Sequence, residues 1–311
     1  MSKKKRYRVR NWKDYNKALV RRGSLTLWFD EESIKKWHKS KKKKGRGRPC
    51  KYTDIAIQCM LTLKSVFDLP HRATQGLVES LIELLDLPIE AADYSTICRR
   101  QKHLDIKLQK KNRSESLHGV FDSTGLKVFG EVEWKVRQHG YSKRRTWRKL
   151  HLGIDEASGE IIASVLTTND LGDGEVLPDL LEQINSPLHQ ASGDGAYDSF
   201  ENDDLLHKRG AKVTIPPREN AKTRRHGNCK SPPLIRDEVI RAIRKLGRAE
   251  WKKKNVYHRR SIAETTMFRI KQIFGDKLHA IIFESQAAEA FIKCNVLNKM
   301  TSLGMPDSYV R

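Results

Sequence analysis

Three acidic residues, Asp122, Asp194 and Glu264, lie far apart in the sequence. The first two are expected at the ends of strands and the third on a helix. Carboxylates brought together repel one another unless a cation lies between them. Oxygen-only ligands suit Mg²⁺ or Mn²⁺, which also accept phosphate oxygens. Two such ions about 4 Å apart can activate a water or a 3′-hydroxyl for in-line attack on a phosphodiester. If these acids converge, their chemistry is metal-dependent phosphoryl transfer.

A single Asp at the end of a strand more commonly caps a turn, and this is the alternative interpretation for each acid. We expect Asp155, Asp173 and Asp198 to be such caps. The hypothesis of a catalytic cluster therefore depends on where the sheet order places the three acids, and on the excess of positive charge in the chain.

Residues 257–271 contain no Gly or Pro and are predicted to form one helix. At about 100° per residue, Tyr257, Arg260 and Lys271 fall within about 40° of Glu264 around the helix axis. A stripe roughly 90° away is apolar and is expected to face the core: Ala263, Met267, Ile270 and Phe274. A polar stripe beside a buried one suits a helix at the edge of an active site. The alternative is a solvated helix with an Arg–Glu pair four residues apart.

The segments that carry the first two acids have strand periodicity. Residues 119–128 are interpreted as strand, tight turn and strand, and they begin an antiparallel meander of three strands with 149–155 and 160–166. The elements after the meander are helix 176–184, a strand ending near residue 193, helix 199–208, strand 211–215, and helices 235–246, 257–271 and 285–302. This order predicts an α/β fold, a ribonuclease H-like domain with a mixed five-stranded sheet. Its first and fourth strands are neighbours, so we expect Asp122 and Asp194 to converge.

The N-terminal segment, residues 1–51, holds 20 Lys or Arg against four acids, with aromatic residues interleaved. Charge of this density predicts a mostly extended, flexible basic arm that contacts phosphates. Arg46 and Arg48 lie in an Arg-Gly-Arg-Pro sequence, which resembles arms that read the minor groove of DNA. The alternative for this short motif is a solvated linker.

Residues 52–110 are predicted to be a helical DNA-binding domain. Thr53 is expected to cap a helix that runs to residue 67, a second helix spans about 72–85, and Ser95 is expected to cap a short basic helix with Arg99 and Arg100. Three helices that end in a basic one resemble a helix-turn-helix module. A plain helical bundle packed on the next domain is the alternative.

The net charge, hydropathy and cysteine content limit the classes of function that the chain can have. The formal net charge of +23 predicts a polyanionic partner, most simply nucleic acid. No apolar stretch is long enough to predict a membrane span, and the basic first residues lack the apolar segment of a signal peptide. Five scattered cysteines without a C-x-x-C spacing favour a reducing cytosol. We expect a catalytic domain over 111–304, with a basic insertion at 218–256, and a tail at 305–311.

The residues around the acids resemble a known family. Tyr257, Arg260, Glu264 and Lys271 match every position of a Tyr-x2-Arg-x3-Glu-x6-Lys signature, and residues 121–127 and 193–198 match the contexts of the other two acids. The chain resembles bacterial insertion-sequence transposases of the DDE type, specifically insertion-sequence family five within the family-four-like group. The resemblance covers residues from about 45 onward. One departure is residues 255–256, where the family more often has a small residue and Gly.

The resemblance implies an enzyme that binds the terminal inverted repeats of its element, cuts there and joins the freed 3′-hydroxyls to double-stranded target DNA. It implies that Asp122, Asp194 and Glu264 hold Mg²⁺ or Mn²⁺, as two ions, and that the signature Tyr, Arg and Lys hold the terminal strand. It also implies that the protein acts as a homodimer or a larger synaptic assembly, in the bacterial cytoplasm and at the nucleoid. Further DNA contacts are expected at Lys127, Arg145 and Trp147.

Three other function classes remain open from the sequence. A metal-dependent nuclease that cuts without joining shares the same acids. A domesticated transposase that only binds DNA is disfavoured by the three intact acids. A basic protein associated with RNA or ribosomes would fit the charge but leaves the acids without a role.

Overall fold

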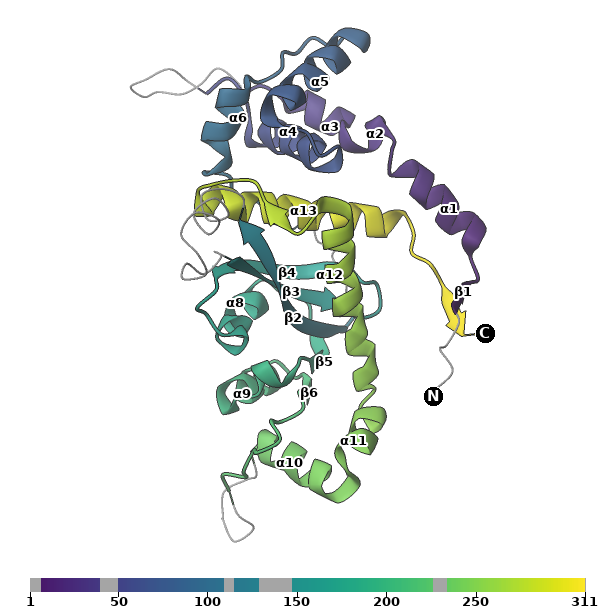
Figure 1. The fold of residues 1–311 in the computed structure, drawn as a ribbon, viewed down its shortest axis with the longest axis vertical. Coiled ribbons are helices and arrows are strands. Elements are labelled where there is room, and N and C mark those ends of the chain that lie inside the picture. The colour runs from purple at the N-terminus through teal and green to yellow at the C-terminus, as the bar shows by residue number, and fades with distance from the viewer. Residues whose placement is uncertain (1–6, 40–49, 109–114, 129–146, 226–233, 311) are drawn as a thin grey trace, which may run out of the picture. The chain divides into compact units, whose positions relative to one another are not determined.

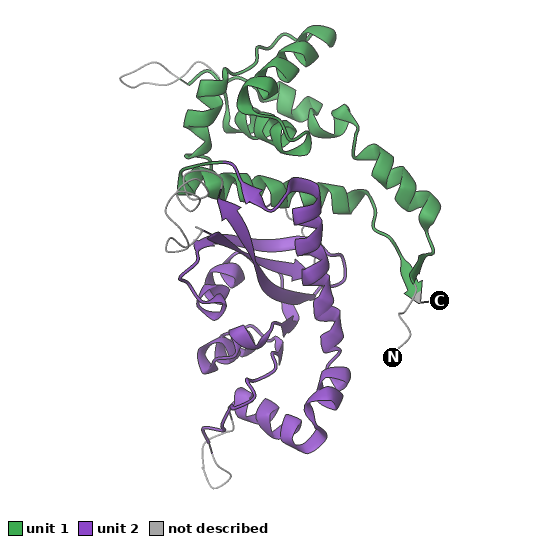
Figure 2. Cartoon of the chain, in the orientation of Figure 1, with its two compact units in different colours: residues 1–107, 280–311 green, residues 108–279 purple. Residues whose placement is uncertain are grey.

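The computed structural model describes residues 7–39, 50–108, 115–128, 147–225 and 234–310 (Figure 1). The chain divides into two compact units, one formed by residues 1–107 with 280–311 and the other by residues 108–279 (Figure 2). Three of the expected DNA contacts, Arg46, Arg48 and Arg145, lie outside the described residues. Among the described helices, none has the length and apolar character needed to cross a membrane.

The second unit is built on a mixed six-stranded sheet. Its order is β4-β3-β2-β5-β6, and β7 pairs with β2 off this path. β2 to β4 form the expected antiparallel meander, while β5 pairs in parallel with both β2 and β6. The predicted adjacency of the first and fourth strands is therefore confirmed. The strands are β2 (Leu117–Val128), β3 (Trp147–Asp155), β4 (Ile161–Thr168), β5 (Leu188–Ser192), β6 (Lys212–Thr214) and β7 (Lys277–Leu278).

Two details of the predicted sheet were wrong. The stretch interpreted as strand, turn and strand is one continuous strand, because Ser123, Thr124 and Gly125 all keep their antiparallel pairing with β3. Gly125 does not form a turn. Its missing side chain leaves space for the Trp147 ring, since a Cβ at this position would lie 3.3 Å from that ring. The predicted five strands lacked β7, whose two residues pair with Lys127 and Val128 at the end of β2.

Each face of the sheet has its own helical cover. Phe121 lies on one face, within a core that includes side chains of α8 (Leu177–Glu182) and α9 (Phe200–Lys208). The alternate residues Val120 and Leu152 are fully buried and lie on the other face. Asp122 shares this second face, and α12 (Ser261–Phe274) packs against β2 and β3. The acid of β2 and the helix that carries Glu264 therefore meet on one side of the sheet.

The first unit contains the predicted three helices, α4 (Asp54–Val66), α5 (His71–Leu84) and α6 (Tyr94–Gln101), which all pack against one another. The Thr53 hydroxyl caps α4 as predicted, accepting a hydrogen bond from the Ala56 N–H at 3.2 Å. The cap of α6 is Asp93, whose carboxylate accepts from the Ser95 N–H at 2.8 Å, so the prediction of Ser95 as the cap was wrong.

The last long helix, α13 (Phe283–Leu303), packs against α4 and α6 and falls in the first compact unit. It is buried along much of its length, and these partners come from the other end of the chain. The catalytic domain expected over 111–304 therefore crosses the boundary between the two compact units, and its extent stays a prediction.

The N-terminal segment is folded in its described part, so the prediction of an extended arm over residues 1–51 was wrong there. The interleaved aromatic residues supply a core that the charge count alone conceals: Trp28, Phe29 and Trp37 are buried, and the Trp37 indole donates to the Glu90 carbonyl at 2.8 Å. The expected tail forms β8 (Ser308–Val310), which pairs with β1 (Tyr7–Val9). The helices of this segment are α1 (Trp12–Arg21), α2 (Leu25–Trp28) and α3 (Glu31–Lys35).

Candidate active site

Asp122 lies on β2, and Asp194 follows the end of the neighbouring strand β5. Val120 of β2 pairs with Ser192, the last residue of β5, so the two acids follow in register two residues further along parallel strands. Asp122 was expected at a strand end, but β2 continues past it while β5 stops. Asp194 starts the short helix η2 (Gly195–Tyr197), and its carboxylate accepts a hydrogen bond from the Ala196 N–H at 2.8 Å. One aspartate is thus held in a strand and the other in a loop.

Arg260 connects Asp122 to Glu264. Its Nη1 lies 2.6 Å from Asp122 Oδ2, and its Nη2 lies 2.7 Å from Glu264 Oε1. The Asp122 and Arg260 side chains are 14% and 19% exposed, whereas Glu264 is 64% exposed. The predicted Arg–Glu pair is therefore present, and its arginine also bonds to the acid of the sheet.

Electrostatics in this cluster act in both directions. Burial raises the pKa of Asp122, and the nearby charge of Asp194 raises it further, while the Ser123 N–H and Arg260 oppose the rise. The pKa of Arg260 is also raised: burial opposes its charge, but Tyr257, Asp122 and the other acids stabilise it. A cation is thus needed where the acids approach each other, and a guanidinium supplies it.

Tyr257 begins a segment that differs from the prediction. Residues Tyr257–Arg260 form a 3-10 helix, η3, and only then does α12 begin, so the single helix predicted over 257–271 was wrong at its start. The left-handed backbone of Val256 (φ 54°) immediately precedes the turn. The Tyr257 hydroxyl still reaches the site, donating to the Gly193 carbonyl at 3.3 Å, and its ring lies 5.9 Å from the Arg260 guanidinium.

Lys271 lies on the same helix as Glu264. It is partly exposed and lies seven residues after Glu264, which is about two turns and 10 Å along the same side of the helix. Phe268, one turn after Glu264, is 65% exposed on this side of α12.

The loop that carries Asp194 is held by residues that the sequence interpretation also missed. The buried Asn202 amide donates to the Gly174 carbonyl at 3.0 Å and to the Tyr197 carbonyl at 3.1 Å. It therefore joins η2 to η1 (Asp173–Val176). The side chain of Tyr197 is fully buried beneath the same loop.

The three acids expected to cap turns divide into different roles. Asp155 is a turn cap as predicted and accepts from the Ser158 N–H at 3.2 Å. Asp173 instead pairs with Lys149 at 3.3 Å. Asp198 pairs with Arg236 through two hydrogen bonds of 2.6 and 2.8 Å. Neither of the last two is primarily a cap.

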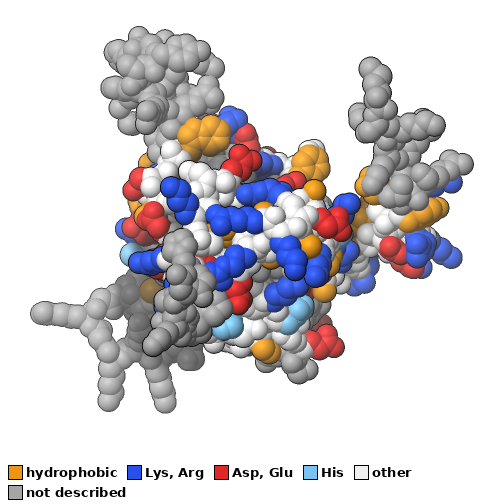
Figure 3. All heavy atoms as spheres, turned by 90° about the horizontal axis from the view of Figure 1, so that it is seen from below, with side chains coloured by type: hydrophobic (Ala, Val, Ile, Leu, Met, Phe, Trp, Pro, Cys, Tyr) orange, Lys and Arg blue, Asp and Glu red, His pale blue; other side chains and the backbone are white. Residues whose placement is uncertain are grey.

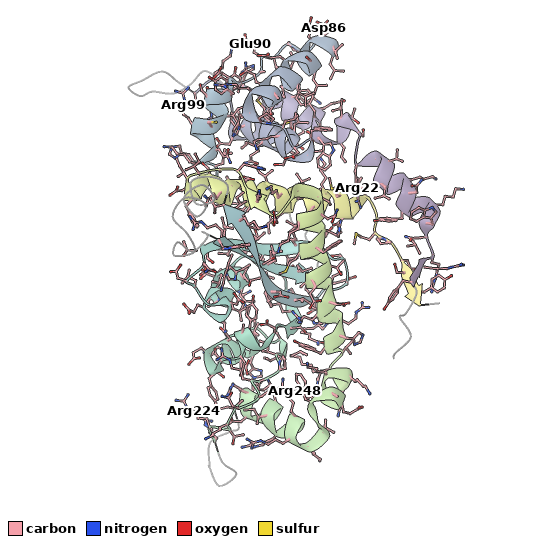
Figure 4. The ribbon with its side chains drawn as sticks, in the orientation of Figure 1. Arg22, Asp86, Glu90, Arg99, Arg224 and Arg248 are labelled. Atoms are coloured by element: carbon pink, nitrogen blue, oxygen red, sulfur yellow. The ribbon has the colours of Figure 1, made fainter. Side chains whose placement is uncertain are left out.

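The remaining candidate contacts are spread over both units. Lys127 pairs with Asp276 at 2.5 Å and lies 5.7 Å from the Trp147 ring. Arg99 is exposed on α6 (Figure 4), where its guanidinium bonds locally to Ser95. Arg100 is engaged within the helical unit, since it pairs with Asp54 and donates to the Tyr52 carbonyl at 2.9 Å.

The acids do not form a ready-made metal cage. Within the described ranges, no group of three or more His, Cys, Asp or Glu side chains is arranged to hold a metal ion. Arg260 occupies the position between two of the acids. The donor set itself, carboxylate oxygens only, suits a hard divalent cation.

Comparison with known families decides what kind of protein this is. Two family models, each described as a transposase DDE domain, match residues 20–131 and 113–299, and the second alone covers more than half of the chain. The chain belongs to the DDE transposase family. As an insertion-sequence DDE transposase it is an enzyme that acts on DNA, cutting it and transferring strands with the help of divalent metal ions. DDE transposase domains have ribonuclease H-like folds, which agrees with the mixed sheet of the second unit.

Proposed function

We propose that this transposase belongs to insertion-sequence family five, binds the terminal inverted repeats of its element, and cuts and joins DNA there by two-metal phosphoryl transfer. The observation that carries the proposal is the Arg260 bridge. Arg260 joins Asp122 of β2 to Glu264 of α12, beside the loop that holds Asp194. The full Tyr-x2-Arg-x3-Glu-x6-Lys signature in the sequence supports the assignment to this insertion-sequence group.

Asp122, Asp194 and Glu264 are the proposed metal ligands. Their oxygen donors fit Mg²⁺ or Mn²⁺. Burial, and to a smaller extent the charge of Asp194, raises the pKa of Asp122, and a bound cation would stabilise its ionised form. When bound, the ions would supply activation of the attacking oxygen and stabilisation of the leaving oxygen. Arg260 has to give up Asp122 and Glu264 before those oxygens are free for such a role.

The signature cations and the tyrosine are proposed to hold the terminal strand. Arg260 and Lys271 present positive groups on the side of α12 that carries Glu264, and charge-assisted bonds from such groups to phosphates are strong. Once released from the acids, the Arg260 fork can hold a phosphate. Tyr257, anchored at the Gly193 carbonyl, lies between this arginine and the Asp194 loop.

Recognition of the repeats is proposed for the first unit. Its helices α4 to α6, which pack against one another, are proposed to act as a helix-turn-helix-like module, with the exposed Arg99 as a phosphate or base contact. Arg46, Arg48, Lys127, Arg145 and Trp147 are retained as proposed DNA contacts. Arg100 is instead proposed to stabilise the helical unit, because both of its contacts are internal. Because two element ends are cut together, we propose a dimer or larger assembly on DNA.

A cleavage and joining assay tests the proposal. The Glu264→Gln variant should bind a labelled terminal-repeat duplex as the wild type does, yet give neither cut nor joined products with Mg²⁺. Substitution at the exposed Glu264 should leave the fold intact, which thermal unfolding checks. Cleavage by this variant at the wild-type rate would remove Glu264 from the site, and cut products without joined ones in the wild type would identify a nuclease.

A further inference from the structure

A strongly basic helical hairpin precedes the signature residues. It comprises α10 (Ile235–Leu246) and α11 (Arg248–Lys254), and we call residues 234–256 the basic hairpin. It holds eight Lys or Arg against three acids. One of these acids, Asp237, is buried and accepts hydrogen bonds from the Arg224 and Arg225 N–H groups, so it is already engaged. In the view of Figure 3, many Lys and Arg side chains are visible on the surface.

The basic hairpin is fixed to the second unit. Trp251 of α11 is buried, and Arg236 of α10 makes two hydrogen bonds to Asp198. Arg248, labelled near the junction of the two helices in Figure 4, donates to the Pro217 carbonyl at 2.5 Å. Gln190 of β5 donates to the Asn255 carbonyl at 3.1 Å. The positive charges are therefore presented from a defined place on the catalytic unit.

Three of these charges face solvent without an acidic partner. Arg244, Lys245 and Lys254 are exposed, and none forms an ion pair with any residue that the structure describes. Helix-borne cations without acids to neutralise them attract polyanions, of which a nucleic-acid backbone is the one this enzyme acts on.

The end of the basic hairpin leads directly to the candidate active site. The Lys252 ammonium lies 5.1 Å from the Tyr257 ring, and the Tyr257 hydroxyl bonds to the carbonyl of Gly193, the residue before Asp194. Positive charge thus continues from α11 through Tyr257 to Arg260. A DNA segment held by the basic hairpin would lie beside the acids.

We infer that the basic hairpin binds the double-stranded target DNA into which the element end is joined. This inference rests on the proposed function, since strand transfer requires a second duplex at the acids. Contacts to phosphates hold a duplex in place without reading its sequence, and this is what a surface for target DNA of any sequence needs. Long, solvent-exposed Lys and Arg side chains meet this requirement. The single amide side chain of the basic hairpin, Asn255, is already bonded to the Trp251 carbonyl.

The test compares two triple variants of the full chain. Arg244→Gln/Lys245→Gln/Lys254→Gln removes the three charges, and the matched control Arg244→Lys/Lys245→Arg/Lys254→Arg keeps them. Each protein is assayed for binding to a short duplex of random sequence across a salt series, for binding to a pre-cut terminal-repeat duplex, and for joining of that end to a plasmid. Thermal unfolding establishes that both variants are folded.

We expect the neutral variant to bind the random duplex about 10-fold or more weakly. The negative slope of log affinity against log salt concentration should become shallower by about 2 to 3, at about 0.9 per lost phosphate contact. Joining should fall in parallel, while the pre-cut terminal repeat binds as it does to the wild type and the control behaves normally. An unchanged salt slope with normal joining would overturn the inference. Equal loss of terminal-repeat binding would also overturn it, by assigning the surface to the element's own DNA. If the wild type never joins ends, the proposed function fails, and the salt series with random duplex still decides whether the hairpin binds DNA.

Discussion

Arg236 and Arg260 both pair with carboxylates in the second unit, but the two clusters are built differently. Arg236 gives two donors to the two oxygens of one acid, Asp198, whose side chain is 1% exposed. Arg260 divides its donors between Asp122 and the exposed Glu264. A fork closed on one buried carboxylate holds two segments together, whereas a guanidinium shared between two acids can leave them one at a time. The first arrangement is expected to be structural and the second to be exchangeable.

The largest effect should come from opening the closed pair. Arg236→Met leaves Asp198 buried without its cation, which costs about 3–5 kcal/mol in unfolding free energy. Urea unfolding followed by circular dichroism measures the loss. The double variant Arg236→Met/Asp198→Leu should recover part of it, because no buried charge then remains. A loss for Arg236→Met below that of Arg260→Gln would contradict the distinction between the two clusters.

A neighbouring acid gives the closed cluster a pH dependence. Burial, followed by the charge of Asp198, raises the pKa of Asp203 from 3.8 to about 7, and within the described residues its Oδ1 has no hydrogen-bond partner. Because the folded pKa is higher than the unfolded pKa, the folded state binds the extra proton between pH 4 and 7. This contribution to stability is complete below about pH 4 and is lost as pH rises toward 7, with a slope approaching about 1.4 kcal/mol per pH unit.

The Asp203→Asn variant checks this expectation. Its unfolding free energy, measured by urea titration at several pH values, should lack the decline that the wild type shows between pH 4 and 7. A matched Asp204→Asn variant, which changes the adjacent and exposed acid, should keep the decline. An identical pH profile for Asp203→Asn and the wild type would mean that Asp203 titrates normally.

A smaller effect is expected at the support of the Asp194 loop. Asn202→Ala leaves the Gly174 and Tyr197 carbonyls without their donor, at a cost of about 1–3 kcal/mol. DNA cleavage should fall as well, because the loop that positions Asp194 loses its connection to η1. Asn169→Ala, in an exposed position of the same unit, should change the unfolding free energy by less than about 0.5 kcal/mol. Equal stability of the two variants would remove Asn202 from this role.

The smallest change in stability should follow from removing the Arg260 guanidinium, which Asp122 and Glu264 share. Arg260→Gln is expected to cost about 1 kcal/mol, since the bond to the solvated Glu264 contributes little and the glutamine amide can still donate to the buried Asp122. The same change should strengthen Mn²⁺ binding, because a cation no longer competes for Asp122 and Glu264. Electron paramagnetic resonance of Mn²⁺ titrated into the DNA-free protein measures this. Weaker Mn²⁺ binding than in the wild type would show that Arg260 supports the metal ligands instead of competing with them.

Much of the candidate site could be predicted because it depends on short-range rules. Strand alternation and sheet order brought Asp122 and Asp194 together, and helical spacing brought Arg260 to Glu264. The Arg260–Asp122 bond joins residues 138 positions apart, and no local pattern predicts it. Asn202 was missed because an amide whose two carbonyl partners lie far along the chain has no sequence signature.

The errors in the fold have a common physical origin. The first 51 residues were interpreted from their charge, but a few large apolar groups can outweigh many solvated cations, as the buried Trp28 and Trp37 do. Lys and Arg side chains keep their charges in water while the backbone packs. Likewise Gly125 was interpreted from its turn preference, although it lies in a continuous strand where the Trp147 ring packs close to its Cα. In each case a partner far along the sequence decided the outcome.

The membership of α13 in the first unit has a consequence for biosynthesis. Residues 108–279 are contiguous, so all of the catalytic unit has been translated before residues 280–311 emerge from the ribosome. The first unit, in contrast, needs both the earliest and the latest residues, since α13 packs on α4 and β8 pairs with β1. Domains generally fold as units during synthesis. A nascent chain of this transposase therefore holds the complete six-stranded sheet while its helical unit still awaits α13, and a stop codon near residue 280 would leave the helical unit without that helix.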